Sequence, residues 1–217
     1  MDRPDLISRL DHLDFFKYVD AQDFDLVRSS LLDNIIEKKM FVIPSGGNFQ
    51  NLDGRLFSFD MESLTEAGAL SLFNSLAATL EKAGLKISGV EQIFDDNTGS
   101  SSGRPDYRFI LNERTCNLGK VPLFPLFVRG FVTAKYLRFL NRVLRTNKIK
   151  ERFYLMNDSA SDTALGFLTP AQARFINSLM LNPNDKVYKP TFRNIIIRPA
   201  MQVIGVIIKV IFSKKAT

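Results

Sequence analysis

The sequence predicts a single α+β domain in which helices pack on a mixed or mostly antiparallel sheet. Stretches with helical hydrophobic spacing alternate with short strand-like runs and hairpins, not with regular strand–helix–strand units. The 217 residues fit one domain. We expect a globular domain over residues 1–185 and a basic, apolar segment over 186–217, rich in β-branched residues, whose strands complete the sheet. A doubly wound parallel fold is the alternative.

The first part of the chain predicts two helices, one strand and a third helix. Apolar residues recur at helical spacing between Asp5 and Lys38, with a junction near residues 20–25. Residues 44–48 predict a turn, and residues 55–60 alternate as a strand does. A broad apolar face then predicts a helix that starts at residue 63 or 65 and ends at Gly84.

Two hairpins and two helices are expected in the second part. Residues 85–94 and 107–118 predict two strands around a loop rich in glycine and serine, and residues 153–156 and 164–167 predict a shorter hairpin. A long helix is expected from about Arg129 to Thr146. Thr169 as N-cap and Pro170 at the first helical position predict a last helix, which runs to about residue 181.

The residue counts exclude several kinds of active site. Cys116 is the only cysteine and His12 the only histidine, so the chain can form no intramolecular disulfide framework, no zinc site of several Cys and His ligands, and no catalytic set that needs a second histidine. His12 lies between Asp11 and Asp14, a pattern typical of a solvated surface. We therefore expect no metal site and no cofactor, and we expect a binding protein rather than an enzyme.

One carboxylate pattern leaves an enzymatic alternative open. Asp106 after a proline, followed by Glu113 on a strand, resembles the acidic pair that holds Mg²⁺ in a class of nucleases. The lysine of that pattern is replaced by Thr115. The alternative function is thus a metal-dependent nuclease or phosphodiesterase that uses Asp106 and Glu113, with Asp95 and Asp96 as the remaining candidate carboxylates.

Charge is distributed unevenly along the chain. Residues 1–118 contain 12 basic and 19 acidic side chains, whereas residues 119–217 contain 17 basic and 4 acidic ones. Two faces of one fold that attract each other would explain this asymmetry, and so would an anionic partner such as an acidic protein, nucleic acid or phospholipid.

The long helix predicted over residues 129–146 is amphipathic. Projected at 100° per residue, four cations fall on one narrow stripe, opposite an apolar face. These four residues, called the basic stripe below, are Lys135, Arg138, Arg142 and Arg145. Cations at this spacing repel one another unless something negative covers them, so the basic stripe is the predicted binding site.

The predicted function is that of a protein-binding module that engages an acidic partner surface through the basic stripe. Small bacterial toxin-neutralising (immunity) proteins have this general character, although no motif matches a particular one. Nucleic acid is another partner that a basic surface could bind, although the sequence contains no motif of the known nucleic-acid-binding modules. A third possibility is a peripheral membrane protein anchored by residues 186–217. The acidic N-terminal residues and the single cysteine predict a cytoplasmic location.

Overall fold

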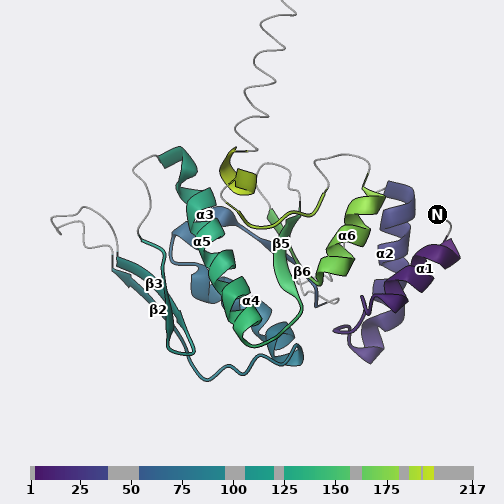
Figure 1. The fold of residues 1–217 in the computed structure, drawn as a ribbon, viewed down its shortest axis with the longest axis horizontal. Coiled ribbons are helices and arrows are strands. Elements are labelled where there is room, and N and C mark those ends of the chain that lie inside the picture. The colour runs from purple at the N-terminus through teal and green to yellow at the C-terminus, as the bar shows by residue number, and fades with distance from the viewer. Residues whose placement is uncertain are drawn as a thin grey trace, which may run out of the picture.

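The structure is a computed structural model that describes residues 3–38, 54–95, 106–119, 125–156, 163–180, 186–191 and 193–197. Helices pack with two small antiparallel sheets, so the predicted α+β class is confirmed and the parallel alternative is wrong. In Figure 1, α5 lies on one side of the sheet that contains β5 and β6, and α6 lies on the other. The predicted turn at 44–48 and the glycine–serine loop lie outside the described residues.

The helices and strands follow one another in an order close to the predicted one. Their bounds are α1 Arg3–His12, η1 Ala21–Asp23, α2 Phe24–Lys38, β1 Leu56–Phe59, α3 Met61–Thr65, α4 Ala69–Lys82, β2 Val90–Asp95, β3 Asp106–Leu111, β4 Arg114–Asn117, α5 Pro125–Thr146, β5 Arg152–Met156, β6 Thr163–Leu168, α6 Pro170–Leu179 and η3 Arg193–Ile197.

The two sheets are each three-stranded in the described residues. The first has the order β1-β6-β5, and the second is the meander β2-β3-β4. Gly166 stands opposite both Leu56 and Tyr154 at the centre of the first sheet. A Cβ atom at Gly166 would lie 2.9 Å from Cδ1 of Leu168, so a larger residue here requires the Leu168 side chain to shift.

The first sheet is buried on both faces, because neighbouring residues of a strand point to opposite sides. On one face, Phe153 and Leu155 of β5 join a core formed with α4, α5 and the second sheet. On the other face, Tyr154 and Met156 join a second core formed with α1, α2 and α6. β5 therefore links the two halves of the molecule.

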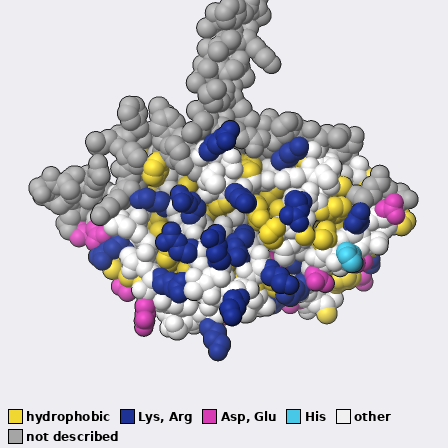
Figure 2. All heavy atoms as spheres, in the orientation of Figure 1, with side chains coloured by type: hydrophobic (Ala, Val, Ile, Leu, Met, Phe, Trp, Pro, Cys, Tyr) yellow, Lys and Arg dark blue, Asp and Glu magenta, His cyan; other side chains and the backbone are white. Residues whose placement is uncertain are grey.

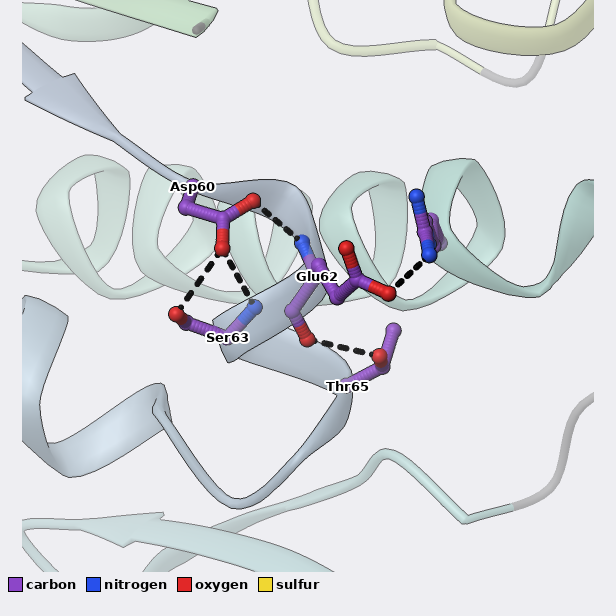
Figure 3. A network of polar contacts seen from close by, with 5 residues as sticks. Asp60, Glu62, Ser63 and Thr65 are labelled. Carbon is purple, nitrogen blue, oxygen red and sulfur yellow. Dashed lines mark hydrogen bonds and ion pairs between the residues drawn. The ribbon is translucent and has the colours of Figure 1, made fainter. Parts of the chain in front are cut away.

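The helix predicted over residues 63–83 is divided into α3 and α4. The side chain of Asp60 accepts hydrogen bonds from the backbone N–H groups of Glu62 and Ser63 and starts α3 (Figure 3). The chain then breaks at Ala67, whose φ is 69°. The side-chain amide of Gln92 on β2 holds the break, because it donates to the Ala67 carbonyl and accepts from the N–H of Leu70.

The strand predicted over residues 107–118 is divided as well. β3 ends before Asn112 and Glu113, whose φ angles of 48° and 65° form a tight turn into β4. The Asn112 side chain accepts from the backbone N–H of Ser88 and donates to the carbonyl of Lys86. This contact across the sheet stabilises a left-handed turn that contains no glycine.

The predicted start of α6 and the predicted end of α4 are confirmed. Thr169 and Gln172 form a reciprocal capping box, with Pro170 at the first position of α6, although the helix ends at Leu179, not near residue 181. Gly84 follows α4 with a φ of 95°.

The C-terminal segment is described only over residues 186–191 and 193–197. Tyr188 forms one antiparallel bridge with Leu155 at the edge of β5, and its N–H and C=O both bond that residue at 2.9 Å. The next apolar run differs from the expected strand, because Arg193–Ile197 forms one π-helical turn. Residues 198–217 lie outside the described part, and their role in the sheet stays a prediction.

Among the helices that the structure describes, we find none with the length and apolar character needed to cross a membrane.

Candidate functional site

The stretch from Arg114 to Met156, which contains β4, α5 and β5, is the most basic part of the fold. It has ten lysine and arginine residues and a single acidic residue, Glu151. Glu151 is buried, and its carboxylate accepts a hydrogen bond of 2.7 Å from the Tyr18 hydroxyl. Burial, followed by this hydrogen bond, raises the pKa of Tyr18. The one carboxylate of the stretch therefore faces the interior.

The predicted amphipathic character of α5 is confirmed. Arg138, Arg142 and Arg145 are exposed, and Lys135 is half-buried, with its Nζ 3.4 Å from the Asn117 carbonyl. The apolar side of the helix is buried in the core, as predicted. Its buried residues include Val132, Tyr136, Leu137, Leu140, Val143 and Leu144.

The described residues do not neutralise the exposed arginines of the basic stripe. Four ion pairs are found in the described part of the chain: Arg28–Asp11, Lys82–Asp20, Arg108–Asp106 and Arg129–Glu62. Only Arg129 belongs to α5, and it lies roughly 180° around the helix from Arg138 at the usual helical rotation. None of these four ion pairs joins an acidic residue of the N-terminal half to Arg138, Arg142 or Arg145.

Further arginines extend the basic stripe into a wider surface. Arg114 of β4 donates a hydrogen bond of 3.0 Å to the hydroxyl of Thr146, in the last turn of α5. Arg152 of β5 donates to the carbonyl of Ile149, in the turn that follows α5. The positive charges of Arg152 and Arg174 of α6 both act on Tyr154, whose pKa is raised by burial.

We call this region the basic surface. It consists of the basic stripe together with Arg114, Arg152 and Arg174. Figure 2 shows Lys and Arg side chains gathered on the face that α5 presents in Figure 1, whereas most Asp and Glu side chains in this view lie toward the rim. A surface with one sign of charge attracts anionic groups over several ångströms and orients them before contact.

Neighbouring titratable groups are affected by these charges. Burial raises the pKa of the Cys116 thiol to about 11, and the positive charges of Lys135 and Arg142 oppose this rise. The thiol is therefore protonated at neutral pH and is a poor nucleophile. The pKa of Arg152 is lowered first by burial and then by the charge of Arg145.

The two carboxylates of the enzymatic alternative, Asp106 and Glu113, do not lie side by side. Asp106 begins β3 and Glu113 lies in the turn beyond its other end, so the strand rise places them about 17 Å or more apart. The expectation that Glu113 lies on a strand was wrong. Asp106 forms an ion pair of 2.7 Å with Arg108, and Asp95 stands opposite Asp106 in the ladder. Asp96 lies outside the described residues.

His12 is exposed at the end of α1. The neighbouring Asp11 forms an ion pair with Arg28 at 2.9 Å. In the described ranges we find no cluster of three or more His, Cys, Asp or Glu side chains that could hold a metal ion.

Comparison with known proteins gives no independent indication of function. No protein-family model, curated protein or solved structure matched this chain. The chemistry of the site is the basis for a functional proposal.

Helical periodicity identified the basic stripe, but it missed the arginines on neighbouring elements. Arg114 and Arg152 lie on strands, and Arg174 lies on a helix from the far side of the first sheet. One sequence signal could have located Arg152, namely the close spacing of four basic residues along the chain: Arg145, Lys148, Lys150 and Arg152. The burial of the intervening Glu151 could not be seen without its contact to Tyr18, which is 133 residues away.

Proposed function

We propose that this chain is a non-enzymatic binding protein whose basic surface docks on an acidic surface of another protein. The observation that carries the proposal is the exposure of Arg138, Arg142 and Arg145 without an acidic partner among the described residues. Guanidinium groups form paired hydrogen bonds with carboxylates, so an acidic protein surface would satisfy both their charge and their donors.

The aromatic residues around the basic stripe favour a protein partner over single-stranded nucleic acid. Nonspecific binding of single strands relies on exposed aromatic rings on which bases stack. The rings of Tyr136 and Phe139 on α5 and of Tyr154 on β5 are buried. The basic surface offers cations beside these elements but none of these three rings as a stacking platform.

The proposed mechanism is electrostatic and steric. The basic surface steers an acidic partner into contact, and the bound chain then covers the partner's working site. This is the manner in which a toxin-neutralising protein acts, and that type of function is part of the proposal. So is a cytoplasmic location, which fractionation of the source cells tests.

The test is affinity purification of the tagged chain from its source cells, with and without nuclease and mild detergent, followed by mass spectrometry. We expect one stoichiometric protein, with a measurably acidic surface, that survives both treatments. The variant Arg138→Glu/Arg142→Glu/Arg145→Glu should lose this protein while its unfolding free energy is retained. Its matched control is Arg9→Glu/Lys17→Glu/Lys86→Glu, which changes net charge equally at exposed positions outside the basic surface.

The results separate the partner classes. Retention of the protein partner by the α5 variant would contradict the proposal. Loss of all bound material on nuclease treatment would instead indicate nucleic acid as the partner. Loss on detergent treatment, together with binding to anionic liposomes, would indicate a membrane surface.

A further inference from the structure

The end of α5 brings arginines from three elements together. Arg145 lies in the last turn of the helix, which ends at Thr146. Arg114 reaches this turn from β4 through its hydrogen bond to the Thr146 hydroxyl. Arg152 reaches the following turn from β5 through its hydrogen bond to the Ile149 carbonyl. The N–H of Ile149 in turn bonds the Leu144 carbonyl at 3.1 Å, so this turn is fixed to the helix end.

Arg152 differs from the arginines of the basic stripe because its guanidinium group is held in place. Its Nη1 donates to the backbone carbonyls of Ile149 and Glu151, and its side chain is partly buried. Its Nε and Nη2 form no hydrogen bond with the described residues, so these donors remain for a ligand. A fixed donor loses less conformational entropy on binding than a freely rotating one.

Arg145 and Arg152 are also close enough to act on each other. The charge of Arg145 contributes to the lowered pKa of Arg152, after the larger effect of burial. The carboxylate of Glu151, which bonds the Tyr18 hydroxyl in the interior, acts on the pKa of Arg152 in the opposite direction and less strongly than Arg145 does. An anion placed between the two guanidinium groups would relieve their repulsion, which none of the described acidic residues does through an ion pair.

We propose that Arg145 and Arg152 together form the principal anion-binding point of the basic surface, at which one oxyanion of the partner is held between the two guanidinium groups. The oxyanion is a side-chain carboxylate or the phosphate of a phosphorylated side chain. The inference rests on the proposed function and names the two residues that contribute most to partner binding. Arg138 and Arg142 then serve mainly to attract the partner, because Arg145 is the arginine of the basic stripe whose charge acts on Arg152.

NMR of the arginine Nε–Hε groups of the full chain tests this assignment directly. Inorganic phosphate, a hexaglutamate peptide and a phosphoserine peptide are the three probes. We expect saturable shifts of the Arg145 and Arg152 resonances, with much smaller shifts for Arg138. The phosphoserine peptide binding more tightly than hexaglutamate would assign a phosphorylated partner, and the reverse order would assign a carboxylate.

Two variants separate the anion-binding point from the rest of the surface. Arg145→Gln changes an exposed side chain, and Arg152→Lys keeps the charge but removes the guanidinium fork. Each should weaken binding of the better peptide by about tenfold, whereas the matched control Arg138→Gln should weaken it by less than about twofold. The Arg145→Gln result stands even if Arg152→Lys proves unstable.

Equal, non-saturating shifts at all exposed arginines, or equal effects of Arg138→Gln and Arg145→Gln, would overturn the inference. The proposed function would remain if the triple α5 variant still lost the partner protein. The further inference and the proposed function would both fail if the triple α5 variant also kept the partner protein.

Discussion

Arg55 is buried between the N-terminal helices and the first sheet, whereas Arg138, Arg142 and Arg145 project from α5 into solvent. The guanidinium group of Arg55 donates hydrogen bonds to backbone carbonyls in the turn that follows α1 and in β6, and to the side chain of Gln172. It also lies 4.5 Å from the centre of the Tyr18 ring. Arg138, Arg142 and Arg145 have no comparable contacts among the described residues.

Arginine therefore has two different roles in this molecule, one in the interior and one at the surface. Arg55 satisfies the buried carbonyl oxygens of Phe15 and Phe167, and it joins the turn after α1 to β6 and α6. The exposed arginines contribute little to the fold and leave their donors for a ligand. Substitutions in the two regions should therefore separate stability from binding.

The largest expected effect is on stability at Arg55. Arg55→Met leaves several buried carbonyls without a donor, so we expect the free energy of unfolding to fall by about 3–5 kcal/mol. Urea denaturation measures this change. The control Arg138→Met should change the same quantity by less than about 0.5 kcal/mol. Similar losses in the two variants would mean that the two regions do not differ as described.

A smaller loss is expected at Asn141, which lies on α5 beside the basic stripe. Its side-chain amide donates to the Phe153 carbonyl at 3.0 Å and accepts from the Phe153 N–H at 2.7 Å, so it takes the place of a neighbouring strand at the edge of β5. Asn141→Leu should lower the free energy of unfolding by about 1–3 kcal/mol. Arg142→Leu, at the next position, is the control and should be nearly neutral in the same denaturation experiment.

Alkaline pH should lower the free energy of unfolding through a buried tyrosine, Tyr107, more than through groups on the surface. Tyr107 donates to the Leu64 carbonyl, and burial raises its pKa from about 10 to about 12. The unfolded chain loses this proton first, so the stability linked to it is complete below pH 10 and is lost as the pH rises through 12. We expect wild-type protein to lose about 1 kcal/mol at pH 11 from Tyr107 alone.

Tyr107→Phe removes this proton and provides the comparison. Between pH 8 and pH 11 its unfolding free energy should fall by about 1 kcal/mol less than that of the wild type. An identical pH dependence in both proteins would show that Tyr107 titrates normally in the fold.

The smallest expected effect is a gain in stability at Arg142. This arginine repels Arg138 and Arg145, which lie four and three residues away on the same helix face. Arg142→Gln should therefore raise the free energy of unfolding by a few tenths of a kcal/mol at low salt. The gain should disappear near 1 M NaCl, where charges are screened within about 3 Å. A loss of stability at low salt would indicate that Arg142 has a structural partner.

The parts of the fold that local residues determine were predictable from the sequence. Thr169 and Pro170 start α6 through their own geometry, and Gly84 ends α4 in the same way. The two missed breaks depend on distant side chains. Gln92 holds the left-handed Ala67 between α3 and α4, and Asn112 bonds the backbone near Ser88. Sequence spacing contains no information about contacts of this kind.

In the candidate site, too, the part that local sequence determines was predictable and the part that depends on other elements was not. Periodicity along one helix located the basic stripe, because its positions are fixed by the helical repeat. Arg152 was missed because hydrogen bonds in the turn between α5 and β5 direct its guanidinium group. The Asp106–Glu113 pair of the enzymatic alternative does not come together, because the strand that was predicted to carry Glu113 ends before this residue.

The most direct test of the central claim measures partner retention and unfolding free energy on the same two triple variants. We predict that Arg138→Glu/Arg142→Glu/Arg145→Glu loses the partner protein and unfolds at nearly the wild-type urea concentration, whereas the charge-matched variant at Arg9, Lys17 and Lys86 keeps both properties. Equal partner retention by the two variants would contradict the claim that the exposed arginines of α5 exist for binding.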